Sequence, residues 1–93
     1  MIKGYANAKT RRVHETGSPK GFRGLDGEKA ADRMDDLQAA PSLENLAPLR
    51  SLRLHKLKGN LKGFWAIDVN GPWRIVFKPT TAGFDAVEIV DYH

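Results

Sequence analysis

The chain has 93 residues and a mass of 10.3 kDa, which suits a single domain spanning residues 1–93. Hydrophobic residues make up 41% of it and charged residues 28%, as in soluble globular proteins, so we do not expect wholesale disorder. There is no cysteine, no apolar run of roughly 18 residues and no apolar leader after Met1. We therefore expect a small cytoplasmic domain without a disulfide scaffold, a thiolate metal site or a cysteine nucleophile.

Positive charge is unevenly spread along the chain. The net charge is +4, yet residues 25–45 hold six acids against two bases, a net of −4, which leaves +8 for the rest. Between residues 50 and 78 the single acid Asp68 stands among seven basic residues: Arg50, Arg53, Lys56, Lys58, Lys62, Arg74 and Lys78. Such a density attracts polyanions, because their binding releases condensed counterions. A face that only keeps the protein soluble explains the charge equally well, so charge alone assigns no partner.

The first half of the chain predicts one short strand and two helices. Residues 2–6 are typical of a short strand, and residues 7–15 predict a polar helix with a thin apolar face that ends at Gly17. Five helix-breaking residues then predict a flexible loop: Gly17, Pro19, Gly21, Gly24 and Gly27. Asp26 is a suitable N-cap for a second, acidic helix that runs to Ala40. After it, Ser42 can cap one more helical turn through Leu46.

After Pro48 apolar and polar residues alternate, which predicts strands with one buried face. The alternating segments are 52–55, 65–69, 73–78 and 87–89. Asn70-Gly71-Pro72 predicts an antiparallel hairpin between two of them, and residues 80–83 predict a second turn. The predicted fold class is therefore α+β: a short N-terminal strand and two helices packed on an antiparallel sheet of about four to five strands.

The alternation also predicts a basic surface on the sheet. If Leu52, Leu54, Trp73 and Ile75 face the helices, their neighbours must face the opposite way. Those neighbours are Arg53, His55 and Arg74. We therefore expect a basic, histidine-bearing surface opposite the core.

Few kinds of chemistry suit these residues. The sequence has no glycine-rich phosphate loop, and its histidines, His14, His55 and His93, lack the spacing of metal ligands. Cleavage of RNA needs less, because the ribose 2′-hydroxyl is itself the nucleophile. The protein supplies a base, an acid and cations, roles that suit histidine, lysine and arginine. Candidates for these roles are His55, Lys58, Arg74, Asp91 and His93.

Four segments together resemble a known family of toxins. They are Leu54-His55-Lys56-Leu57-Lys58-Gly59, Gly63-Phe64-Trp65-Ala66-Ile67, Trp73-Arg74-Ile75-Val76-Phe77 and the terminal Val87-Glu88-Ile89-Val90-Asp91-Tyr92-His93. In these segments, and in its length and order of elements, the chain resembles the HigB toxins of the RelE/ParE superfamily. The combination is more specific than any one segment, and the likeness is strongest from residue 52 onward.

The resemblance implies a ribosome-dependent endonuclease that cuts messenger RNA in the decoding site without a metal or other cofactor. It places the active positions on His55, Lys58, Arg74, Asp91, Tyr92 and His93. His93 or His55 would transfer protons, and Asp91 would orient an imidazole or act as a base. Lys58 and Arg74 would stabilise the scissile phosphate, and Tyr92 would position the nucleotide. The products would be a 2′,3′-cyclic phosphate and a 5′-hydroxyl.

The resemblance also implies partners. A HigA-like helix-turn-helix antitoxin would neutralise the toxin, and ribosomal or messenger RNA would bind Arg53, Lys56, Lys62 and Lys78. Two other functions remain open at this point: a non-catalytic gyrase inhibitor of the ParE branch, and a basic nucleic-acid-binding module without chemistry. The nuclease hypothesis requires the last three residues to lie beside His55 and Arg74.

Overall fold

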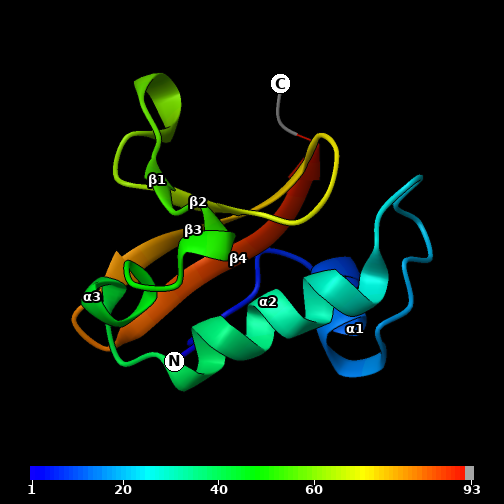
Figure 1. The fold of residues 1–93 in the computed structure, drawn as a ribbon, viewed down its shortest axis with the longest axis horizontal. Helices are drawn as coiled ribbons and strands as arrows, with labels where there is room; N and C mark the ends of the chain where they lie inside the picture. The colour runs from blue at the N-terminus through cyan, green and yellow to red at the C-terminus, as the bar shows by residue number, and fades with distance from the viewer. Residues whose placement is uncertain (92–93) are drawn as a thin grey trace.

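A computed structural model describes residues 1–91, and Figure 1 shows their fold. The helices are α1 (Ala8–Thr16), α2 (Gly27–Ala39) and α3 (Leu43–Leu46), and two 3-10 turns are η1 (Arg50–Leu52) and η2 (Gly59–Leu61). The strands β1 (His55–Lys56), β2 (Trp65–Asp68), β3 (Trp73–Thr80) and β4 (Gly83–Asp91) pair antiparallel in chain order. This arrangement confirms the predicted α+β class. None of the helices within residues 1–91 is long and apolar enough to cross a membrane.

Both predicted helices form, and their ends follow from local chemistry. The Asn7 side chain accepts a hydrogen bond from the backbone N–H of Thr10 at the start of α1. Gly17 ends that helix with φ of 72°, a conformation that glycine adopts without steric cost. Asp26 caps α2 by accepting from the backbone N–H of Lys29, as its position in the sequence predicts.

The main core lies between the helices and one face of the sheet. Met34 and Leu37 of α2 are fully buried there, together with Ile67 of β2 and Ile75 and Phe77 of β3. Trp65 and Trp73 are partly buried against the same cluster, and for Trp73 this agrees with the predicted orientation toward the helices. Because successive strand residues point to opposite faces, this burial sends the residues between them to the far side of the sheet.

The N-terminal segment covers the outer edge of β4. Ile2 and Tyr5 form isolated parallel bridges with Phe84 and Val87, where the sequence predicts a short strand. Further along the same edge, the backbone N–H of Ile89 donates to the buried hydroxyl of Thr10. These contacts satisfy an edge that would otherwise expose unpaired backbone groups.

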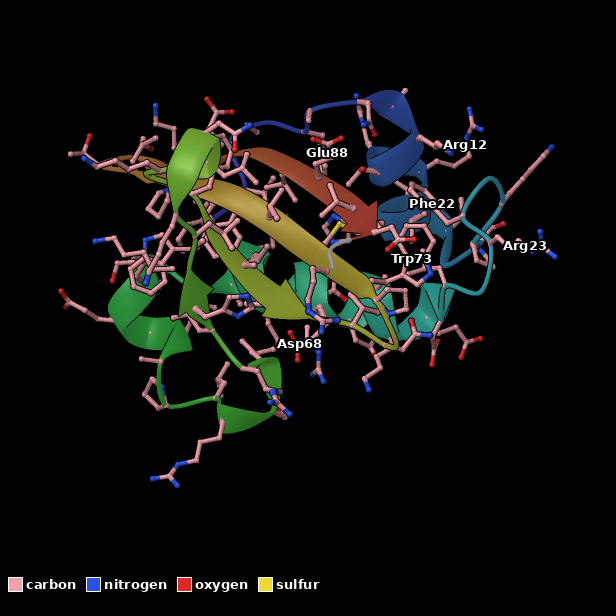
Figure 2. The ribbon with its side chains drawn as sticks, turned by 90° about the horizontal axis from the view of Figure 1, so that it is seen from above. Arg12, Phe22, Arg23, Asp68, Trp73 and Glu88 are labelled. Atoms are coloured by element: carbon pink, nitrogen blue, oxygen red, sulfur yellow. The ribbon has the colours of Figure 1, made fainter. Side chains whose placement is uncertain are left out.

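The glycine-rich loop between α1 and α2 is tied to the β2–β3 hairpin. Phe22 is buried and meets the indole of Trp73 edge-on, with ring centroids 5.5 Å apart. The indole N–H of Trp73 donates to the carbonyl of Arg23, and the Asn70 amide donates to the carbonyl of Gly24. Figure 2 shows Phe22, Arg23 and Trp73 gathered at this end of the molecule. The loop is therefore more constrained than its composition suggests.

The predicted strand over residues 52–55 is wrong for most of its length. Arg50–Leu52 form the turn η1, Arg53 has φ of 52°, and only His55 and Lys56 pair with β2. Leu52 and Leu54 nevertheless reach the main core, as the alternation predicts. Their burial comes from a turn that points both side chains inward, and a turn can give the same alternating pattern as a strand.

The hydroxyl of Thr10 should contribute measurably to stability. Replacing Thr10 with valine keeps the volume but leaves the buried N–H of Ile89 without this partner, so we expect a loss of about 1–3 kcal/mol in unfolding free energy by urea denaturation. Thr81→Val is the matched control, because Thr81 lies exposed in the turn between β3 and β4, and its cost should stay within about 0.5 kcal/mol. Equal losses in the two variants would contradict this role.

Candidate active site

The sheet face opposite α1 and α2 carries His55 and Arg74, two of the residues predicted to take part in chemistry. We call it the helix-free face and define it by Ala66, Asp68, Arg74 and Val76. In the pairing register Ala66 lies opposite Val76 and Asp68 lies opposite Arg74, so all four side chains share this face. Ala66 and Val76 are buried in a second, smaller apolar cluster with Leu57. The loop from β1 to β2 adds Leu61 and Phe64 to it. The helix-free face therefore has an apolar part under this loop and a charged part beside it.

The charged part is organised around one carboxylate. Asp68 Oδ1 lies 2.8 Å from Nε of Arg74, and Asp68 Oδ2 lies 3.2 Å from Nε of Arg53. Asp68 and Arg74 are 20% and 23% exposed, whereas Arg53 is 77% exposed. The Asp68–Arg74 pair is therefore partly shielded from water, and the Asp68–Arg53 pair is mostly screened by it. Figure 2 labels Asp68 near the tip of the β2 arrow.

The Arg74 side chain is held from a second direction by the hairpin turn. Its Nη1 donates to the carbonyl of Gly71 at 2.7 Å and to its neighbour Trp73's carbonyl at 2.9 Å. Together with the bond to Asp68, these contacts use Nε and Nη1 of the guanidinium. An incoming phosphate oxygen can approach at Nη2, which none of these three bonds uses.

Arg53 links this cluster to His55. Its carbonyl lies 2.8 Å from Nδ1 of His55, and its side chain reaches Asp68. A carbonyl oxygen can only accept, so Nδ1 of His55 must carry the proton in this bond. The lone pair of the neutral ring then lies on Nε2, the nitrogen that can take up a proton. His55 is half-buried on β1, opposite Ala66 and thus on the helix-free face.

His55 and Arg74 lie on the same face, but their strands, β1 and β3, are separated by β2. From their register positions the two Cα atoms are two strands apart and offset by two residues, about 10 Å across the sheet and about 7 Å along it. Asp68, on the intervening strand, draws the Arg74 guanidinium toward β1. A nucleotide linkage could therefore lie between the two side chains.

His14 has a different environment. Its Nδ1 bonds to the Tyr5 hydroxyl, and its Nε2 lies 2.8 Å from Oδ1 of Asp35. Burial raises the pKa of Tyr5, and the negative charges of Glu15 and Asp35 raise it further against the opposing effect of Arg11. The hydroxyl therefore stays protonated and can donate to His14. With both nitrogens engaged, His14 joins the N-terminal segment to α1 and α2, as expected of a structural histidine.

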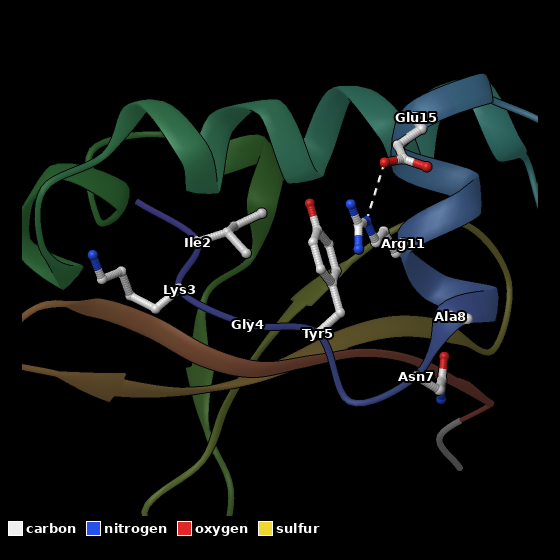
Figure 3. A pocket seen from close by; sticks show the side chains of 8 residues that line it. All are labelled: Ile2, Lys3, Gly4, Tyr5, Asn7, Ala8, Arg11 and Glu15. Atoms are coloured by element: carbon white, nitrogen blue, oxygen red, sulfur yellow. Dashed lines mark hydrogen bonds and ion pairs between the residues drawn. The ribbon is translucent and has the colours of Figure 1, made fainter.

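A cleft of about 490 Å³ lies beside this network, away from the predicted site residues. Figure 3 shows Tyr5 rising from the N-terminal segment, with the Arg11–Glu15 ion pair of α1 on the other side of the cleft. The cleft is lined by Ile2, Lys3, Gly4, Tyr5, Asn7, Ala8, Arg11 and Glu15. None of the residues that the sequence singled out for chemistry lines it.

The predicted lysines are all exposed, but they do not share one position. Lys58 directly precedes η2 in the β1–β2 loop, and Lys62 directly follows it. Lys56 lies opposite Trp65, out of phase with His55 and so on the other side of the sheet edge. Lys78 lies four residues beyond Arg74 on β3, on the same face but about 13 Å along the strand.

The C-terminal positions are only partly described. Asp91 ends β4 opposite Trp73, so strand alternation places it out of phase with Arg74. Tyr92 and His93 lie outside the described residues. Their predicted positions beside His55 and Arg74 therefore stay predictions.

Sequence reasoning missed two residues that organise the cluster, Asp68 and Arg33. Asp68 was visible only as the single acid of a basic segment, and its position opposite Arg74 in the hairpin was the signal that could have found it. Arg33 of α2 donates from Nε to the Asp68 carbonyl at 3.2 Å and from Nη2 to the Ser51 carbonyl at 3.4 Å. Within residues 1–91, no three histidine or acidic side chains converge to hold a metal ion.

Comparison with known proteins agrees with the family resemblance. Residues 3–93 match the model of the HigB-like toxins, described as the RelE-like toxin of type II toxin-antitoxin system HigB. The chain belongs to this family. It is also 29% identical to the endoribonuclease HigB of Proteus vulgaris over 93 residues, which covers all of both chains. Membership in a type II toxin family implies an antitoxin partner for this toxin.

The backbone of Arg53 offers a test of how the toxin builds this cluster. With φ of 52° and ψ of 48°, Arg53 is in the left-handed region, which costs an ordinary residue roughly 1–2 kcal/mol. Arg53→Gly and Arg53→Ala both lose the ion pair, but only glycine relieves the backbone. We expect the glycine variant to be more stable by about 1 kcal/mol in urea denaturation.

The control for this comparison is Lys56, which lies in the extended conformation of β1. There the order should reverse, because glycine is destabilising in a strand by roughly 0.5–1 kcal/mol relative to alanine. If Arg53→Ala were at least as stable as Arg53→Gly, the left-handed turn before His55 would not be a constraint of this fold.

Proposed function

We propose that this toxin is an endoribonuclease that cuts messenger RNA in the decoding site of the ribosome, by acid–base chemistry that needs no metal. The observation that carries the proposal is its likeness, over the full length of both chains, to a HigB endoribonuclease. The geometry of the helix-free face supports it, because a proton acceptor and a partly shielded guanidinium lie on one surface. Action at the ribosome places the toxin in the cytoplasm.

The chemistry follows from the tautomer of His55. Nε2 takes the proton of the ribose 2′-hydroxyl, and the resulting oxygen attacks the adjacent phosphorus. Arg74 and Lys58 stabilise the negative charge that builds up on the phosphate oxygens. The bond to the 5′-oxygen then breaks, and that oxygen receives a proton from an acid, the role we assign to His93. The products are a 2′,3′-cyclic phosphate and a 5′-hydroxyl, with no cofactor consumed.

The remaining predicted residues have supporting roles in this proposal. Asp91, which lies out of phase with Arg74, orients an imidazole in this proposal and does not act as the base. Tyr92 positions the nucleotide. The exposed side chains of Arg53, Lys56, Lys62 and Lys78 hold the backbone of messenger or ribosomal RNA. The antitoxin is of the HigA-like helix-turn-helix type.

The role of His55 can be tested in a purified translation reaction by mapping new 5′ ends of the message. The wild-type toxin should cut inside codons, and each new 5′ end should carry a hydroxyl group. His55→Ala should slow cutting by about 100- to 10,000-fold, the usual contribution of a general acid or base, and His93→Ala should do the same. Lys58→Ala should also reduce cutting, whereas the matched change Lys20→Ala in the exposed loop before α2 should not.

Three outcomes would contradict the proposal. Translation could stop while messages stay intact, which would leave a binding protein without chemistry. Expressing cells could instead accumulate DNA double-strand breaks with uncut messages, which would favour the gyrase inhibitor of the ParE branch. Equal cutting by wild-type and His55→Ala toxin would remove His55 from the mechanism.

A further inference from the structure

Asp68 is the acid that holds the two guanidinium groups of the helix-free face together. Its two carboxylate oxygens bind different arginines, Arg74 from β3 and Arg53 from the turn after η1. Without a carboxylate between them, two like charges would repel each other and turn toward solvent. Asp68 is also the only acid from residue 50 to residue 78, so no neighbour in that segment could replace it.

The position of Asp68 does not depend on these arginines. The pairing of β2 with β3 fixes its backbone, and the carbonyl of Asp68 accepts a hydrogen bond from Arg33 of α2. Arg33 also binds the carbonyl of Ser51 in η1, the turn that leads into Arg53. Helix α2 thus holds both the end of β2 and the segment that carries Arg53. The carboxylate can therefore be removed while its backbone support stays in place.

The two ion pairs that Asp68 forms differ in strength. The Asp68–Arg74 contact is shorter and joins two side chains that are each about one-fifth exposed, so its geometry is well defined. Arg53 is 77% exposed and is held more weakly. The main effect of Asp68 is therefore on Arg74, whose Nε it binds while the hairpin turn holds Nη1.

We propose that Asp68 is a positioning residue for RNA cleavage, which orients the Arg74 guanidinium so that its Nη2 meets the scissile phosphate. The inference rests on the proposed ribonuclease function. A carboxylate repels a phosphate, so Asp68 acts through Arg74 and does not touch the substrate. It also removes one positive charge from the RNA-binding surface, which weakens binding while it improves orientation.

The opposite effects of Asp68 on RNA binding and on the orientation of Arg74 distinguish a positioning role from a purely structural one. Replacing Asp68 with asparagine keeps the shape and removes the charge. We expect kcat for ribosome-bound message to fall about 10- to 100-fold, because small displacements of a catalytic group are costly. KM should stay the same or fall, because the surface gains positive charge. Asp32→Asn, the same change on an exposed position of α2, should alter neither value.

A double-mutant cycle with Arg74→Lys tests whether Asp68 acts through Arg74. Lysine keeps the charge but has no planar guanidinium for Asp68 to orient. In the Arg74→Lys background, Asp68→Asn should lower kcat by less than twofold. A full 10-fold loss in that background, or an unchanged kcat in the folded single variant, would overturn the proposal. A loss of stability alone would also overturn it, since it would assign Asp68 to the fold only.

Two further measurements distinguish a variant that fails to fold, or a toxin that makes no cuts, from a failure of the inference about Asp68. If Asp68→Asn does not fold, Asp68→Thr replaces it, because a β-branched residue suits the end of a strand, and the same kcat loss and the same cycle are expected. If the wild-type toxin itself makes no cuts, the proposed ribonuclease function fails and the inference falls with it. A cutting wild type with an Asp68→Asn variant of equal kcat overturns the inference alone.

Discussion

The register of the β2–β3 hairpin determines both the core and the candidate active site. Ile67 pairs with Ile75 toward the helices, and Asp68 pairs with Arg74 toward the helix-free face. A slip of one residue would move the isoleucines into solvent and the ion pair into the core, at the cost of burying charge in an apolar layer. The residues that build the core therefore also determine that the Arg74 guanidinium and the Asp68 carboxylate lie together on the other face.

The second half of the fold could be predicted largely from alternation, because its strands pack one face against the helices. The expectation of a single buried face was incomplete, since Ala66 and Val76 are buried on the other face under the β1–β2 loop. The prediction failed over residues 52–54, where a turn buries Leu52 and Leu54 at the spacing of a strand. The first half depended on breakers and caps such as Asp26 and Gly17, which mark helix ends locally. The loop between the helices could not be placed, because its tie to the hairpin depends on contacts distant in sequence, such as that between Phe22 and Trp73.

In the candidate site, too, some features could be predicted from the local sequence and others depend on contacts distant in sequence. The alternation of strand residues correctly predicted that Arg74 and His55 share the helix-free face, since each lies next to a core residue along the chain. The partner of Arg74 could not be read from spacing, because it comes from the neighbouring strand. The tautomer of His55 depends on a left-handed residue, Arg53, that composition does not predict. Family resemblance proposed the site residues, and the structure shows how the side chains of two of them are held.

The most direct measurement is a structure of the toxin on a ribosome whose message carries 2′-O-methyl groups in the decoding site, so that no cut can occur. We expect the message to lie on the helix-free face, with a phosphate oxygen within hydrogen-bond distance of the Arg74 guanidinium and the methylated ribose beside His55. A message that crosses α1 or α2, or a toxin bound away from the decoding site, would contradict the assignment of this face as the active surface.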